Sequence, residues 1–201
     1  GELAARELGY SFRDGDAWLP EDLLASLARK QGFTDEQRQR FACEVADRMA
    51  EVRTAETNAH GVAARPLAVS QAMFKRRYRD VIRAAHPDTI FVWVRADAAA
   101  VKARLGAGCN LVDTDLGVRM ARDFEAPTEG EEATDVFVVE NGSDMHDSDL
   151  VQQIRAIVVQ AEVGKSPSSS YVGNTPHIST DSAISIGEEE EQERWLESGR
   201  S

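Results

Sequence analysis

The chain has 201 residues, of which 42% are hydrophobic and 29% charged, and its formal net charge is −12. This length can bury an ordinary core within one main domain. The negative charge argues against binding to nucleic acid or to an anionic membrane surface, because both kinds of partner need a basic surface.

The cysteine content indicates a reducing compartment. Cys43 and Cys109 occur without the short spacings of a zinc site. Two such cysteines exclude a disulfide-rich scaffold, so a cytoplasmic protein is expected. The sequence contains no apolar run of about 18 residues, so no transmembrane helix is expected.

Helices and strands are expected to alternate along most of the chain. Local signals support this, including Gly9 as a helix end and a capping box from Thr34 to Gln37. In chain order the expected elements are a helix over 2–9, a strand over 10–13, helices over 21–30 and 34–54, a strand over 67–69, a helix over 74–85, a strand over 90–94, helices over 97–105 and 115–125, a strand over 134–139 and a helix over 149–161.

This alternation predicts an α/β domain with a largely parallel sheet, in which ligands gather at the carboxyl ends of the strands. The composition changes near Gly164 to Ser, Thr, Gly and Pro, followed by an acidic run over 188–191. Such a segment is typical of disorder. We therefore expect a folded domain over 1–162 and a disordered tail over 163–201.

A basic helix follows the short apolar strand at 67–69 and the turn SQAMFK. A buried strand that leads into a basic helix is typical of an anion site. In an acidic chain, a small anionic ligand explains the cluster better than a polymer does, although a solvated helix face is the alternative. The basic residues are Lys75, Arg76, Arg77, Arg79 and Arg83.

Two carboxylates flank a glycine where the first strand ends, in the motif Asp14-Gly15-Asp16. At such a place one carboxylate can organise Mg²⁺, and the other can accept a proton from a substrate hydroxyl. An ordinary Asp-Gly turn is the alternative. Further along the chain, Gly106 to Gly108 marks a candidate mobile loop.

Taken together, the DGD motif, the AMFKRRYRDVIR helix and the FVWVRAD strand resemble the gluconokinase branch of the small P-loop kinases, to which shikimate kinases are related. The resemblance covers about residues 2–160 and includes the FE-x-P segment before the last strand. It implies a three-layer P-loop kinase fold with a parallel sheet. It also implies ATP and Mg²⁺ as cofactors, and phosphorylation of D-gluconate to 6-phosphogluconate.

The resemblance also implies roles for individual residues. Asp14 matches an aspartate near Mg²⁺, and Asp16 matches the aspartate that binds the substrate hydroxyl and acts as a base. In the family, basic residues bind the sugar acid or the transferred phosphate. Their places are matched here by Lys75, Arg76 and Arg79. Nucleotide contacts are matched by Arg104 and Asn141.

The chain departs from the family in three places. The phosphate-binding loop GxxxxGK[ST] and the strand before it do not occur, so the resemblance implies a chain that begins just after this loop and lacks the first, central strand. This chain is therefore expected to be inactive as it stands. Leu19 occupies the place of a family histidine, and the lid reads GAGCNLV with the neutral Asn110 and Leu111.

Three functions are therefore compatible with the sequence. The first is an ATP-dependent kinase of a small hydroxy acid, with gluconate as the substrate. The second is a non-catalytic relative that keeps the fold and binds a partner. The third is a shikimate or nucleoside-monophosphate kinase. A homodimer is also compatible with the sequence.

Overall fold

The computed structural model describes residues 1–106, 112, 114–132, 135–142 and 144–164. The expected mobile loop lies outside the described residues except for Gly106. The expected disordered tail also lies outside them, apart from residues 163 and 164, which end the last helix.

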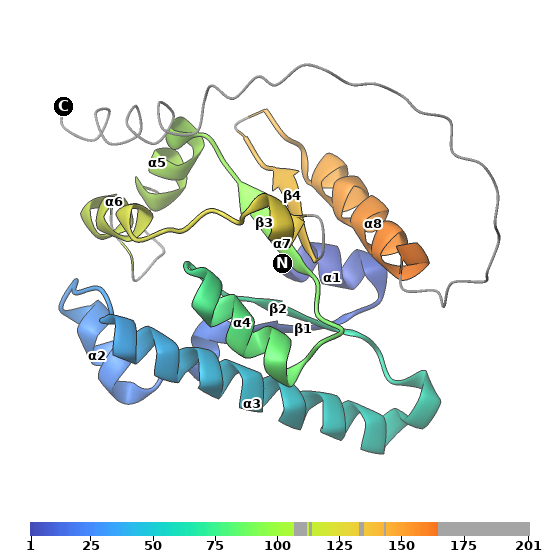
Figure 1. Cartoon of the computed structure of the whole chain (residues 1–201). Helices are drawn as coiled ribbons and strands as arrows, with labels where there is room; N and C mark the ends of the chain where they lie inside the picture. Colours follow the sequence, from blue (N-terminus) through green and yellow to red (C-terminus); the bar gives the residue numbers. More distant parts are fainter. Residues whose placement is uncertain (107–111, 113, 133–134, 143, 165–201) are drawn as a thin grey trace.

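Among the described residues, four strands form two separate parallel pairs (Figure 1). β1 (Ser11–Asp14) pairs with β2 (Leu67–Ser70), with Ser11 opposite Leu67. β3 (Phe91–Arg95) pairs with β4 (Val136–Glu140), with Phe91 opposite Val136. The expected α/β class with parallel strands is confirmed. The expected single sheet is divided, because no described strand joins β2 to β3.

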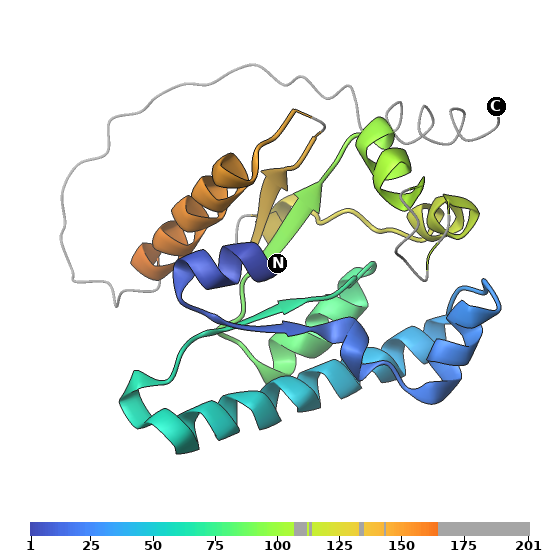
Figure 2. The same cartoon turned by 180° about the vertical axis from the view of Figure 1, so that it is seen from behind.

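Helices connect these strands and cover them. α3 and α4 pack on each other beside the β1–β2 pair, whereas α1 and α8 pack on each other, with α8 against β4 (Figures 1 and 2). The helices are α1 (Glu2–Leu8), α2 (Glu21–Ala28), α3 (Asp35–His60), α4 (Arg76–Ala85), α5 (Ala98–Gly106), α6 (Thr114–Arg122), α7 (Glu129–Glu132) and α8 (Asp147–Gly164). Two short 3₁₀ turns, η1 (Gly15–Trp18) and η2 (Gly61–Ala63), complete the described elements.

The ends of several helices are set by local chemistry. Gly9 ends α1 in the left-handed conformation, at a φ of 75°. Thr34 and Gln37 form the expected capping box at the start of α3, because each side chain accepts a hydrogen bond from the other residue's backbone N–H. α3 continues past the expected end near residue 54 and stops at Gly61, at a φ of 58°.

The main core lies between α2, α3, α4 and α6. Phe41, Val45 and Met49 of α3 are buried as the periodicity predicts, whereas Val52 is only partly buried. The other large members of this core are Leu19, Leu23, Leu27, Ile82 and Leu116. Because α6 contributes Leu116, this core holds α6 against the helices that follow the DGD motif. Among the described residues, no helix is long and apolar enough to cross a membrane.

Candidate functional site

The DGD motif forms a tight turn at the carboxyl end of β1. The Asp14 carboxylate accepts a hydrogen bond from the backbone N–H of Asp16 at 3.0 Å and so caps η1. Gly15 is buried against the end of β2, where a Cβ atom would lie 3.0 Å from the carbonyl oxygen of Ser70 and 2.8 Å from the side-chain nitrogen of Gln71. Glycine therefore lets both carboxylates lie at the joint end of the two strands.

Asp16 lies on this turn with an exposed side chain. Its carboxylate accepts a hydrogen bond from Gln71 Nε2 at 3.3 Å. Partial desolvation raises the pKa of Asp16, the hydrogen bond from Gln71 lowers it, and the charge of Asp14 raises it, with a net increase. A reachable carboxylate of raised pKa is a stronger base than an ordinary aspartate, which suits proton acceptance from a hydroxyl.

Lys75 lies at the start of α4 and points to the first turn of α3. Its Nζ is 3.0 Å from Asp35 Oδ1, and the hydroxyl of Tyr78 donates to the same oxygen at 2.8 Å. Arg77 also pairs with Asp35, and these three donors hold the pKa of Asp35 far below its usual range. Our sequence reasoning missed Asp35. Its position directly after the cap residue Thr34 is one where the helix dipole stabilises an acidic residue, but nothing local indicates its partners on α4.

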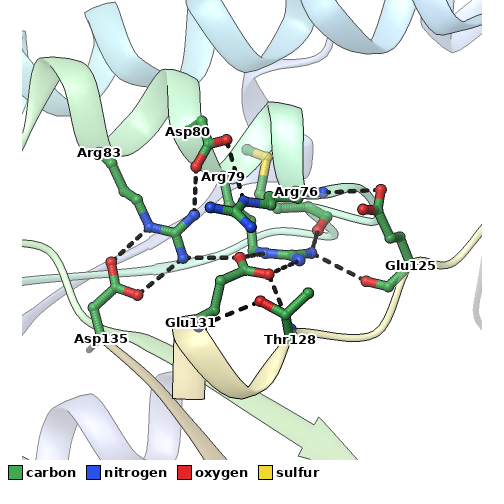
Figure 3. A network of polar contacts seen from close by, with 9 residues as sticks. Arg76, Arg79, Asp80, Arg83, Glu125, Thr128, Glu131 and Asp135 are labelled. Atoms are coloured by element: carbon green, nitrogen blue, oxygen red, sulfur yellow. Dashed lines mark hydrogen bonds and ion pairs between the residues drawn. The ribbon is translucent and has the colours of Figure 1, made fainter. Parts of the chain in front are cut away.

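Arg79 is buried in a network of polar contacts (Figure 3). Its guanidinium donates two hydrogen bonds to the Glu131 carboxylate, at 2.8 and 3.0 Å. It also donates to the carbonyl oxygens of Met73 and Glu125, at 3.1 and 3.3 Å. The substrate contact expected for Arg79 stays a prediction. Its observed contacts join α4 to Glu131 of α7, to Glu125 and to Met73 in the turn before Lys75.

The other two arginines in this network differ in exposure (Figure 3). Arg83 pairs with Asp135 at 2.6 Å and with Glu131 at 3.0 Å, so it joins α4 to α7 and to the residue before β4. Arg76 has an ion pair with Asp80 at 3.7 Å and a side chain that is 53% exposed. A solvated helix face therefore describes Arg76 but not Arg79 or Arg83.

The two residues expected to contact the nucleotide meet each other. Arg104 Nη2 donates to the backbone oxygen of Asn141 at 3.0 Å and to its side-chain oxygen at 3.2 Å. The backbone N–H of Asn141 in turn donates to the carbonyl oxygen of Arg95 at the end of β3. This pair thus lies at the carboxyl ends of β3 and β4, whereas Asp14 and Asp16 lie at those of β1 and β2.

The described residues contain no group of three or more His, Cys, Asp or Glu side chains that could hold a metal ion. Mg²⁺ does not require such a group, because it is commonly bound by one or two carboxylates together with water and substrate phosphates. Asp14 is exposed and uses one oxygen for η1. Its carboxylate therefore fits a partial magnesium site.

Comparison with known proteins identifies the fold. No family model matches the chain, and no curated protein does. A gluconokinase from Sinorhizobium meliloti 1021 superposes with a TM-score of 0.62 and 21% identity, over 81% of this chain and 85% of that one. An unliganded sugar kinase from Janibacter sp. HTCC2649 has a TM-score of 0.62 and 23% identity, over 78% and 83%. The chain therefore has the fold found in these kinases.

Proposed function

We propose that this chain is the main part of a small-molecule kinase that transfers a phosphoryl group from ATP to a hydroxyl of a small hydroxy acid. D-gluconate is the proposed substrate. The observation that carries the proposal is the DGD turn, which places Asp14 and Asp16 at the end of the β1–β2 pair in a fold shared with a gluconokinase.

In this proposal Asp16 orients the attacking hydroxyl and accepts its proton. The raised pKa of its carboxylate supports that role. Asp14 would help to hold Mg²⁺, which would neutralise charge on the phosphates. Because phosphoryl transfer depends mainly on positioning and electrostatics, there is little covalent chemistry for the side chains of the protein to do.

Cations complete the proposed site on both sides. Lys75 and Arg76 would attract the anionic substrate, and Arg79 would fix the turn that carries Lys75 even where it makes no direct contact. Arg104 and Asn141 would contact the nucleotide from the ends of β3 and β4, a placement supported by their mutual hydrogen bonds.

We further propose that residues preceding Gly1 supply the phosphate-binding loop and a central strand between β2 and β3. Each described strand has one partner only, so β2 and β3 each keep an edge with which an added parallel strand could pair. A Cβ atom built on Gly1 would lie 2.8 Å from the Phe12 ring and 3.2 Å from Ser70 Cβ. The first residue of the chain therefore lies beside the β1–β2 pair.

The proposal is tested with the complete protein, extended upstream of Gly1, by release of ADP from Mg-ATP. Gluconate, shikimate and nucleoside monophosphates are compared as acceptors. We expect turnover with gluconate and a decrease of about 10²-fold or more in kcat for Asp16→Asn, the range typical of a general base. Absence of ADP release with every acceptor, or a full-rate Asp16→Asn enzyme, would contradict the proposal.

A non-catalytic relative is the second candidate, and the contacts of Arg79 with protein groups favour it. This candidate predicts that Mg-ATP does not stabilise the complete protein. A kinase instead predicts a rise in Tm that grows with nucleotide concentration, because a ligand that binds only the folded state stabilises it.

A further inference from the structure

Gln71 reaches Asp16 because of the register of the first strand pair. Asp14 and Ser70 are the last residues that lie opposite each other in β1 and β2. The residues that follow them, Gly15 and Gln71, are therefore neighbours at the carboxyl end of the pair. A Cβ atom on Gly15 would lie 3.0 Å from Gln71 Cβ and 2.8 Å from Gln71 Nε2. The Gln71 side chain thus lies across the glycine, whose missing side chain leaves room for it.

Two contacts fix the orientation of the Gln71 amide. Its oxygen, Oε1, accepts a hydrogen bond from the backbone N–H of Ala72 at 2.6 Å. Its nitrogen, Nε2, donates to Asp16 Oδ1 at 3.3 Å. A backbone N–H can only donate and an ionised carboxylate can only accept, so both neighbours require the same orientation of the amide. The side chain is therefore a bridge with a fixed direction, from the end of β2 to the DGD turn.

Asp16 is consequently held at two points. Its backbone N–H donates to the Asp14 carboxylate at 3.0 Å, and its side chain accepts the hydrogen bond from Gln71. Among the described residues, none donates a hydrogen bond to the second carboxylate oxygen, Oδ2. Asp16 therefore presents one engaged oxygen and one open oxygen at the carboxyl end of the strand pair.

This asymmetry matters for a carboxylate that accepts a proton. In the proposed reaction the hydroxyl oxygen of the acceptor bonds to the γ-phosphorus, the bond from that phosphorus to the ADP oxygen breaks, and the hydroxyl proton passes to Asp16. Desolvation and the charge of Asp14 raise the pKa of Asp16, and the hydrogen bond from Gln71 opposes them by stabilising the charged carboxylate. The same bond thus orients the base and favours its ionised form.

We propose that Gln71 is a positioning residue of the kinase, which holds Asp16 Oδ1 so that Oδ2 faces the attacking hydroxyl. This inference rests on the proposed function, because it concerns the base of the same reaction. Gln71 acts through Asp16 and does not contact the substrate. Its substitution should therefore lower kcat and leave the KM for gluconate nearly unchanged.

The experiment measures ADP release by the complete protein, extended upstream of Gly1, as a function of pH and of gluconate concentration. Gln71→Met is the main variant, because methionine keeps the length of the side chain and covers Gly15 but has no donor for Asp16. We expect its kcat to decrease by about 10-fold, the effect of one lost hydrogen bond. The acid limb of kcat/KM should move to higher pH, since the pKa of Asp16 rises without that bond.

Two further variants separate this role from packing. Gln71→Glu keeps the shape of the side chain and an acceptor for Ala72, but it places a second carboxylate beside Asp16. Its acid limb should therefore lie at higher pH than that of Gln71→Met. Gln153→Met is the matched control in α8, where the amide only contacts the sulfur of Met145 at 3.5 Å. It should behave as wild type.

A double variant tests whether Gln71 acts through Asp16. In an Asp16→Asn background, Gln71→Met should cause no further decrease in kcat, because the group that it positions as a base is already lost. An equal further decrease would contradict the inference. Thermal melting of each variant confirms that it is folded.

The inference fails if Gln71→Met has the kcat and the pH profile of wild type, because Gln71 would then only pack over Gly15. It also fails if KM rises while kcat is unchanged, since Gln71 would then bind the substrate itself. Either result, obtained with an active wild-type enzyme, leaves the proposed function intact.

The contact between the two side chains is measured separately, in the chain as it stands, by NMR. The Gln71 amide proton resonances should titrate with the same midpoint as the Asp16 carboxyl carbon, and independent titrations would overturn the inference. Absence of ADP release by wild type would overturn the proposed function, and these titrations would still decide whether Gln71 holds Asp16.

Discussion

Arg79 and Glu131, 52 residues apart in the chain, form a two-point ion pair whose side chains are only 4% and 3% exposed. The pair joins α4 to the short α7. Removing one partner would leave the other as an uncompensated buried charge. We therefore expect Glu131→Ala to reduce the free energy of unfolding by about 3–5 kcal/mol, measured by urea denaturation.

An exposed ion pair in the same protein is the control for this prediction. Arg95 and Glu140 are 2.9 Å apart and are 40% and 56% exposed. Glu140→Ala should cost less than about 1 kcal/mol, as exposed pairs usually do. A cost for Glu131→Ala no larger than that of Glu140→Ala would show that the network in Figure 3 does not hold α4 in place.

Acid stability should depend on the same carboxylate. Hydrogen bonds from Arg79 chiefly lower the pKa of Glu131 from 4.5 to about 2. A group whose pKa is lowered in the folded state stabilises above its unfolded pKa, and that contribution is lost as the pH falls through the folded value. Between pH 4.5 and about 2, wild type should thus lose stability more steeply than Glu131→Gln, as followed by far-UV circular dichroism. Parallel curves over this range would refute the prediction.

The pKa of Asp16 should shift in opposite directions when its two neighbours, Asp14 and Gln71, are substituted. Asp14 raises the pKa of Asp16, so Asp14→Asn should lower it, whereas Gln71→Ala removes a hydrogen bond that lowers the pKa and should raise it. Carboxyl ¹³C chemical shifts against pH give this value directly. Because desolvation disfavours the charged Asp16, Asp16→Asn should also raise Tm at neutral pH. Shifts of equal sign in the two variants would contradict the observed contacts.

Gly15 should tolerate no side chain, because of the close approach of Ser70 and Gln71. A Cβ atom at 3.0 Å from the Ser70 carbonyl oxygen would push the turn off β2. Gly15→Ala is expected to cost about 1–3 kcal/mol, as overpacking does, with a loss of the Asp16–Gln71 hydrogen bond. Gly32→Ala is the matched control, since the nearest atom to its Cβ lies at 3.9 Å. Equal stabilities of the two variants would mean that the turn can move freely.

Features set by neighbouring residues could be predicted from the sequence. The capping box of Thr34 and Gln37 and the helix end at Gly9 both depend on groups within three or four residues, and both are confirmed. The alternation of strands with helices likewise predicted the parallel class correctly.

Features set by distant residues could not be predicted in this way. The partner of Arg79 lies on α7, a four-residue helix without a periodic signal. The burial of Arg79 therefore depends on the packing of α4 against α7. Arg38 is an intermediate case. It precedes the buried Phe41 by three residues and Val45 by seven on the same helix, so its position on the buried face could have been read from the spacing.

The divided sheet has a consequence for how the chain behaves at high concentration. Within the described residues, β2 and β3 each offer a row of backbone groups that no neighbouring strand uses. Strands of other chains can pair with such unpaired edges, and the apolar sequences LAVS and FVWV favour this association. The charge of −12 keeps copies apart only while it is unscreened. Added salt should therefore convert a dispersed solution of this chain into oligomers held by pairing between strands of different copies.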